Sequence, residues 1–183
     1  MYKAPDVESS YKKNNLGKDI YDIVIELNPK VIVEFGILHG YSTLVMSQAL
    51  RDLNNNGKII SYDLFENYKY KHGTMEEVTK LLEANDLQDF VELRYGNLYE
   101  WIEKPDECDL LHIDIANDGD IISLVADKFN DTHILFEGGS EDRDSEWWMK
   151  EYKRTHMYPL KEKLNYEILN SNWPSISLIR GTK

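Results

Sequence analysis

Apolar residues follow two patterns along the chain: continuous runs rich in β-branched residues, and stretches in which apolar residues recur every three to four positions. The first pattern predicts buried strands and the second predicts amphipathic helices. Strands are expected at 31–34, 58–63, 90–94, 109–114 and 133–137, and helices at 16–27, 42–53, 74–85, 99–103, 119–129 and 144–154. Because strands that alternate with helices form parallel sheets, the order of elements predicts an α/β fold.

Both ends of the chain depart from this alternation. Residues 166–169 and 175–179 predict two strands that are joined directly as a hairpin. We therefore expect a Rossmann-like three-layer sandwich, with a mostly parallel seven-stranded sheet and a C-terminal antiparallel hairpin. Residues 1–15 are polar, contain Pro5 and show no periodicity, which indicates a flexible N-terminal arm or a lid over the site. Residues 16–183 are expected to form a single domain.

The first predicted strand leads into a glycine-containing turn and then into a helix. The positions of interest in this segment are Glu34, Gly36, Gly40, Tyr41 and Ser42. A strand, a glycine turn and a helix start are how a Rossmann-type fold presents backbone N–H groups to a ligand. Leu38 stands where the dinucleotide fingerprint G-x-G-x-x-G needs its second glycine, so the segment does not match that fingerprint.

Acidic residues close several of the predicted strands, namely Glu34, Asp63, Asp114 and Glu137. Ligands of open α/β sheets bind at the carboxyl ends of the strands, so these side chains are expected on one rim. A rim lined by carboxylates suits a ligand that carries hydroxyls, an amine and a sulfonium cation, and it does not suit a bare phosphate.

Most residues near this rim allow two roles. Asp63 either accepts hydrogen bonds from a ribose diol or is a solvated carboxylate in a turn. Glu34 either holds the amine of the ligand or braces the glycine turn. Ser42 either helps to bind a carboxylate at the helix N-terminus or caps that helix. His39 lies inside the glycine turn and is therefore expected near the ligand, whereas the charged cluster at 141–144 either covers an acceptor pocket or is solvated.

Composition narrows the classes of partner. The chain of 183 residues has 21 basic and 33 acidic residues and a formal charge of −12, which argues against a nucleic-acid partner. A single cysteine, Cys108, excludes an internal disulfide. We expect a cytoplasmic protein with no membrane partner, because no apolar run approaches a membrane span and the N-terminus lacks a signal-peptide core. The oligomeric state is left open, a homo-oligomer included.

The segment from Glu34 to Ser42 resembles the first motif of class I S-adenosylmethionine-dependent methyltransferases, in the form E-x-G-x-x-x-G-Y-S of small-molecule O-methyltransferases. The branch that it resembles includes the catechol-type and cephalosporin-hydroxylase-like enzymes. The resemblance implies S-adenosylmethionine as cofactor and methyl transfer to an acceptor oxygen. It also implies that Gly96 and Asn97, after the third strand, lie at the adenine ring, although the pair also suits an ordinary turn.

The same resemblance suggests a metal site and also raises a difficulty with it. In catechol-type enzymes an aspartate at the position of Asp114 ligates a divalent metal, a lysine three residues later is the base, and an Asp-Asn pair completes the site. This chain has Asn117 in place of the lysine, and Glu137-Gly138 in place of the pair. Asp114 and Glu137 could still hold Mg²⁺ with waters. The catalytic base would be Asp114, a histidine such as His39, or metal-bound hydroxide.

The sequence therefore predicts an S-adenosylmethionine-dependent methyltransferase that acts on a small hydroxylated acceptor, for example a sugar. One alternative is a methyltransferase-like binding or scaffold protein without turnover, because the family lysine and asparagine are missing. A second alternative is a nucleotide-binding oxidoreductase, which the missing middle glycine disfavours.

Overall fold

The computed structural model describes residues 1–70 and 72–182. Lys71 and Lys183 lie outside the described residues, and both belong to the domain expected for 16–183. The chain divides into two compact units, of which the first ends at Asp109 and the second begins at Leu110. Each unit is described by itself below. The single domain expected for 16–183 stays a prediction.

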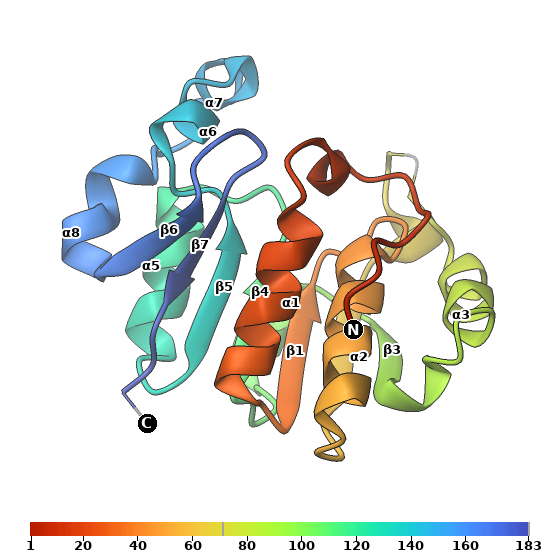
Figure 1. Cartoon of the computed structure of the whole chain (residues 1–183). Coiled ribbons are helices and arrows are strands. Elements are labelled where there is room, and N and C mark those ends of the chain that lie inside the picture. Colours follow the sequence, from red (N-terminus) through yellow and green to blue (C-terminus); the bar gives the residue numbers. More distant parts are fainter. Residues whose placement is uncertain (71, 183) are drawn as a thin grey trace. The chain divides into compact units, whose positions relative to one another are not determined.

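The first unit contains parallel strands in the order β3-β2-β1, formed by β1 (Val31–Phe35), β2 (Lys58–Asp63) and β3 (Val91–Tyr95). Its α-helices are α1 (Leu16–Leu27), α2 (Tyr41–Leu53), α3 (Met75–Glu83) and α4 (Leu98–Glu103). Short 3₁₀ turns are η1 (Ser10–Lys13), η2 (Phe65–Asn67) and η3 (Gln88–Phe90). Helices α1 and α2 pack against each other beside β1, as Figure 1 shows.

The second unit contains strands in the order β4-β5-β7-β6, formed by β4 (Leu110–Ile113), β5 (His133–Glu137), β6 (Tyr166–Asn170) and β7 (Ile176–Ile179). Strands β4 and β5 are parallel, whereas β7 pairs antiparallel with both β5 and β6. Its helices are α5 (Gly119–Lys128), α6 (Glu141–Asp144), α7 (Trp147–Glu151), η4 (Tyr158–Leu160) and α8 (Lys161–Leu164).

This arrangement confirms the predicted α/β, Rossmann-like fold, with a mostly parallel seven-stranded sheet and a C-terminal antiparallel hairpin. The apolar runs become strands because both of their faces are buried: Ile32 and Val33 in β1 and Leu110 and Leu111 in β4 are fully buried. The expected bounds of α1 are also confirmed, and Asn28 ends this helix in the left-handed conformation.

The single helix predicted for 144–154 is wrong. The structure has two short helices, α6 and α7, separated by Ser145 and Glu146. Helix α6 begins earlier than predicted because the Ser140 side chain accepts a hydrogen bond from Arg143 N and so caps it. Two buried charged residues, Arg143 and Asp144, therefore lie in a helix that the charge pattern did not predict.

Candidate functional site

The glycine turn between β1 and α2 has three residues in the left-handed conformation. Gly36 and Gly40 have φ values of 89° and 87°, and Leu38 between them has a φ of 53°. A leucine rarely adopts this conformation, and its side chain is 41% exposed. The turn is therefore a strained segment whose conformation must be fixed by its surroundings. His39, predicted near the ligand, lies in this turn and is half-buried.

Asp63, the last residue of β2, holds the glycine turn in this conformation. Its Oδ2 accepts hydrogen bonds from Ile37 N at 2.6 Å and from Leu38 N at 3.3 Å. Its Oδ1 accepts from Phe65 N at 2.9 Å and lies 3.2 Å from His72 Nδ1. A carboxylate has about four acceptor positions, and these four contacts occupy them, the two at Oδ2 being with the glycine turn. It is a buried carboxylate and not a solvated one.

Glu34 connects β1 to the start of α2 and to β2. This fully buried carboxylate accepts hydrogen bonds from Ser42 Oγ at 2.6 Å, Thr43 Oγ1 at 2.7 Å and Ser61 Oγ at 2.7 Å. Ser61 reaches it because parallel pairing places Ser61 beside Glu34. Of the two roles expected for Glu34, these contacts are those of a brace for the turn.

The N-terminus of α2 is capped by no side chain. Its N-cap is Gly40, so Ser42 is not the N-cap that one interpretation of the sequence suggested. Helices α1, α7 and α8 also have no side-chain cap, whereas α3, α4, α5 and α6 are each capped by a Thr, Asn, Asp or Ser side chain. The N–H groups of the first turn of α2 are thus left for other acceptors, and together with the helix dipole they favour an anion.

The N-terminal arm lies against α2 in the structure. The Tyr2 hydroxyl is 3.3 Å from the Tyr41 hydroxyl, and Lys3 N donates to Gln48 Oε1 at 3.0 Å. Tyr11 is buried and packs edge-on against the Tyr41 ring. Burial, with the Tyr2 hydroxyl adding to it, raises the pKa of Tyr41. Tyr41 therefore fixes the arm to the start of α2, and whether the arm moves stays a prediction.

Gly96 and Asn97 follow β3 and have separate structural roles. A Cβ on Gly96 would lie 2.9 Å from Tyr62 Cδ1, so the Tyr62 ring requires glycine there. Asn97 Oδ1 accepts from Glu100 N at 3.0 Å and caps α4. Tyr62 itself is held by Asp106, which accepts from its hydroxyl at 2.8 Å. No sequence signal singled out Asp106, because its contact with Tyr62 joins residues that are 44 positions apart.

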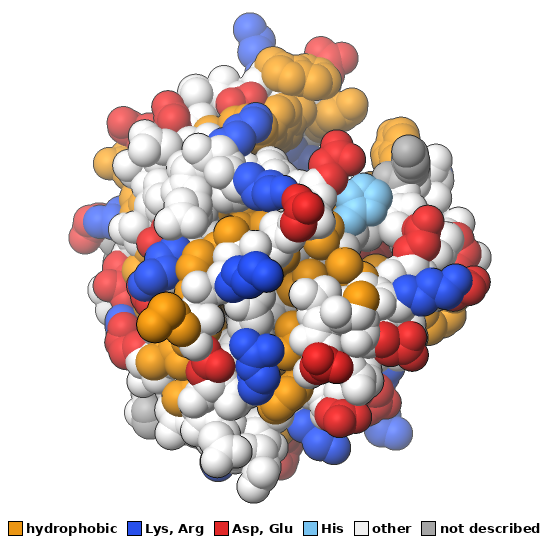
Figure 2. Space-filling model, turned by 45° about the vertical axis from the view of Figure 1, so that its right-hand side comes forward, with side chains coloured by type: hydrophobic (Ala, Val, Ile, Leu, Met, Phe, Trp, Pro, Cys, Tyr) orange, Lys and Arg blue, Asp and Glu red, His pale blue; other side chains and the backbone are white. Residues whose placement is uncertain are grey.

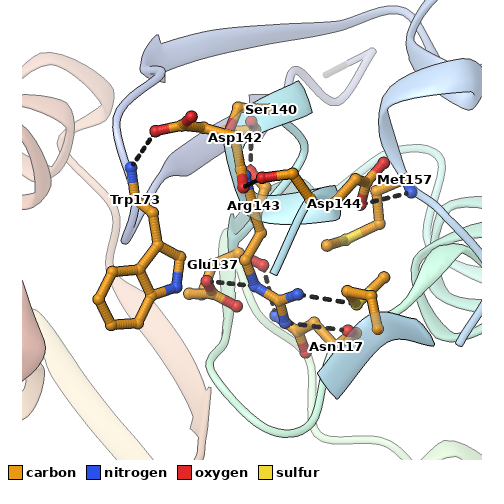
Figure 3. A network of polar contacts seen from close by, with 12 residues as sticks. Asn117, Glu137, Ser140, Asp142, Arg143, Asp144, Met157 and Trp173 are labelled. Carbon is orange, nitrogen blue, oxygen red and sulfur yellow. Dashed lines mark hydrogen bonds and ion pairs between the residues drawn. The ribbon is translucent and has the colours of Figure 1, made fainter. Parts of the chain in front are cut away.

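The rim of the second unit is dominated by a residue that the sequence analysis did not single out, Arg143. Its Nε donates to Glu137 Oε1 at 2.7 Å, and the two side chains are 5% and 8% exposed. Its Nη2 donates to Asn117 O at 3.3 Å and its Nη1 to Met149 Sδ at 2.9 Å. The guanidinium also lies over the Trp148 ring, 5.4 Å from its centroid. Figure 3 shows the guanidinium reaching Glu137 and Asn117.

Asp114 and Glu137, the two expected metal ligands, differ in environment. Asp114 directly follows β4 and is half-buried, whereas Glu137 ends β5 and is buried. Burial raises the pKa of Glu137 to about 7; the Arg143 charge opposes this shift and the Asp114 charge adds to it. The two carboxylates therefore influence each other, but the strong partner of Glu137 is a guanidinium.

Asn117 and Gly138 occupy the positions where the family resemblance placed a base and a ligand. Asn117 Nδ2 donates to Ile113 O at 2.9 Å and to Glu137 O at 2.8 Å, so its amide ties the ends of β4 and β5 together. Gly138 has a φ of 111°, and a Cβ there would displace the flexible end of the Met157 side chain. A side chain that could bind a metal would therefore be strained at position 138 because of the backbone conformation.

Three observations concern possible partners. Within 1–70 and 72–182, no group of three or more His, Cys, Asp or Glu side chains could hold a metal ion. No helix in this part of the chain is long and apolar enough to span a bilayer. Acidic and basic side chains both occur on the face drawn in Figure 2.

A family model described as a methyltransferase domain matches residues 33–133, which include the glycine turn, Asp63 and Asp114. No curated protein matches the chain significantly. Several solved methyltransferases are similar in fold. The O-methyltransferase TomG from Streptomyces achromogenes, which was solved in complex with S-adenosylmethionine and is involved in tomaymycin synthesis, is 15% identical, with a TM-score of 0.64. The alignment covers 97% of this chain and 83% of TomG.

Two further structures give the same result. The O-methyltransferase from Bacillus cereus in complex with S-adenosylhomocysteine is 16% identical, with a TM-score of 0.65 over 97% of this chain and 84% of that one. A methyltransferase from Podospora anserina, also bound to S-adenosylhomocysteine, is 17% identical, with a TM-score of 0.63 over 92% and 78% of the two chains. At these identities the likeness concerns the fold.

Proposed function

Because the chain belongs to the methyltransferase-domain family, which its residues 33–133 match, we propose that it transfers the methyl group of S-adenosylmethionine to an oxygen of a small hydroxylated acceptor, for example a sugar. One observation carries this proposal: a strained glycine turn held by Asp63 leads into α2, a helix that no side chain caps. Support also comes from the similar O-methyltransferases that were solved with this cofactor or its demethylated product.

The first unit provides groups that fit such a ligand. The uncapped first turn of α2, with the Ser42 hydroxyl, would bind the carboxylate of the methionine moiety. Asp63 would bind the ribose, and a ribose hydroxyl would then replace His72, whose ring is a side-chain partner of Asp63. Gly36 and Gly40 would let the ligand approach the backbone closely. Glu34 would support the site indirectly, because its hydrogen bond with Ser42 keeps the glycine turn in place.

Adenine recognition falls to the segment after β3. Gly96 keeps the backbone close to the Tyr62 ring, and Asn97 begins α4 beside it. The Asn97 side-chain oxygen already caps α4. We therefore propose that this segment recognises adenine mainly through its shape and its backbone groups, and less through the Asn97 side chain. Tyr41 would support the site by fixing the N-terminal arm.

Methyl transfer needs two further contributions from the protein besides cofactor binding. When bound, S-adenosylmethionine supplies a methyl group attached to a positively charged sulfur, and this sulfur becomes a neutral thioether once the methyl group has been transferred. The residues of this chain then align the acceptor hydroxyl and take up its proton. Asp114, half-buried at the end of β4, is the carboxylate proposed for that proton, and His39 in the glycine turn is the second candidate.

Calorimetry with S-adenosylhomocysteine tests the proposal. Wild-type protein is expected to bind it, and Asp63→Asn is expected to weaken binding by about 1–3 kcal/mol because a hydrogen-bonded carboxylate is lost. Asp89→Asn, an exposed aspartate of the same unit, is the matched control. Melting temperatures measured in parallel separate loss of fold from loss of ligand. Binding of NAD in place of S-adenosylhomocysteine would contradict the proposal.

A second candidate function is that of a binding protein without turnover. Asn117 and Gly138 favour it, because they stand where catechol-type enzymes have the catalytic lysine and a metal-binding asparagine. Transfer of labelled methyl from S-adenosylmethionine to a panel of hydroxylated acceptors distinguishes the two. Binding of S-adenosylhomocysteine together with a complete lack of transfer, with and without Mg²⁺, would favour the second candidate.

A further inference from the structure

The carboxyl ends of β4 and β5 carry the residues from which a divalent-metal site would have to be built. Glu137 and Asp114 are the expected ligands, and position 138 would have to supply another oxygen. Whether these residues fit a metal can be tested on the contacts within the second unit.

Glu137 does not fit, because its carboxylate is already bound by a cation. Arg143 Nε donates to it at 2.7 Å, and both side chains are almost completely buried. The guanidinium cannot swing away easily, since Met149 Sδ and Asn117 O accept from its two other nitrogens and Trp148 lies against its face. A metal at Glu137 would bring a second positive charge next to a buried guanidinium.

Position 138 does not fit either. Its φ of 111° is a conformation that L side chains rarely adopt, which favours glycine, and glycine offers no side-chain oxygen. The backbone is also engaged, because Gly138 N donates to Ser175 O at 3.0 Å and Ser177 Oγ donates to Gly138 O at 2.7 Å. Of the candidate ligands, Asp114 alone remains, and one carboxylate does not make a site for a hard divalent cation.

We infer that this methyltransferase uses no divalent metal at the ends of β4 and β5, because the buried Arg143 guanidinium neutralises the carboxylate that would otherwise ligate it. This inference rests on the proposed function. Arginine suits the role, because its guanidinium stays charged when buried and binds carboxylates with a fixed geometry.

The inference narrows the class of acceptor. Without a metal to chelate, the acceptor needs one reactive hydroxyl and not two adjacent oxygens. In the transfer, the acceptor oxygen bonds to the methyl carbon while the carbon–sulfur bond breaks and its electron pair stays on sulfur. The acceptor proton passes to a protein base, for which Asp114 is the proposed group.

Electron paramagnetic resonance with Mn²⁺ alone as the probe tests the inference. Wild-type protein at equimolar concentration is expected to leave the free-ion signal unchanged. If the signal is lost, Glu137→Gln locates the ion, with Glu167→Gln as the matched control, because Glu167 forms an exposed pair with Arg180 in the same unit. Binding that Glu137→Gln abolishes and Glu167→Gln keeps would overturn the inference. Binding that both variants keep would support it, because the Glu137 carboxylate then does not ligate the ion.

Two additions keep the test decisive. If Glu137→Gln does not fold, the double variant Arg143→Met/Glu137→Gln replaces it, since this variant removes both buried charges together. S-adenosylhomocysteine binding is measured on the same wild-type sample. Failure to bind it refutes the proposed function, whereas Mn²⁺ bound at Glu137 refutes the metal-free inference and leaves the proposed function standing.

Discussion

Asp106 shows how one side chain can organise the neighbourhood of a proposed ligand site. It accepts hydrogen bonds from Tyr62 OH at 2.8 Å, Trp101 Nε1 at 3.0 Å and Arg94 Nη1 at 3.2 Å. These contacts hold the Tyr62 ring, which stacks on Phe35 and requires glycine at position 96. Burial acts to raise the pKa of Asp106, but the three hydrogen bonds outweigh it and hold the pKa below its usual range.

A pH dependence of stability follows from that lowered pKa. A carboxyl whose pKa is lower in the folded state stabilises the fold above its unfolded pKa of about 4, and this contribution is lost as the pH falls through the folded pKa. Asp106→Asn is therefore expected to lower the free energy of unfolding by about 1–2 kcal/mol at pH 7, and by progressively less below about pH 4. Urea unfolding at several pH values measures both quantities.

Glu107→Gln, at an exposed neighbouring position, is the matched control and should leave stability unchanged across the range. A difference between Asp106→Asn and wild type that stays constant from neutral to acid pH would contradict the assignment of the lowered pKa to this network.

At the residue scale, the sequence indicated which acids end which strands but not what they bind. Asp63 is the last residue of β2, and Glu34 is the last but one residue of β1. Their partners are hydroxyls of α2 and β2 and backbone N–H groups of the turn, which no motif predicts. Arg143 was missed because a charged cluster is usually solvated, whereas here the Ser140 cap starts a helix that directs the guanidinium inward.

At the element scale, the N-terminal arm leads to a further prediction. Its contacts with α2 include the Tyr2–Tyr41 hydroxyl pair and the Lys3–Gln48 hydrogen bond, and Pro5 is buried. Removal of residues 1–9 is expected to lower the free energy of unfolding by about 2 kcal/mol, which corresponds to about 4–8 °C in melting temperature for a chain of this size. Urea and thermal unfolding measure the effect.

Glu8→Gln, an exposed position in the arm, serves as the control for that truncation. An unchanged stability of the truncated protein would favour the flexible arm that the sequence indicated. Helices and strands with strong periodicity were predicted well, because their signals come from residues close in sequence. The segment 144–154 was not, since its conformation depends on contacts with other elements of the same unit, such as Asp144 with Met157 and Tyr158.

At the scale of the whole molecule, the fold follows from the order of elements, and the methyltransferase family follows from the match over 33–133. The identity of the acceptor cannot be predicted in the same way, because it depends on the shape of a pocket formed by side chains from many elements. The total charge gives one constraint of a different kind, since it acts over a distance and does not depend on a particular pocket.

With 33 acidic and 21 basic residues, the protein carries a formal charge of −12, and the face in Figure 2 mixes both signs. Proteins that bind nucleic acid non-specifically through basic surfaces have dissociation constants of about 10⁻⁴–10⁻⁶ M. We expect weaker binding than about 10⁻⁴ M here, because this net charge repels phosphates. Fluorescence anisotropy of labelled duplex DNA and single-stranded RNA at physiological salt measures it. Micromolar binding would move the search for the acceptor from small hydroxylated molecules to nucleic acids, where a local basic surface would then have to outweigh the net charge.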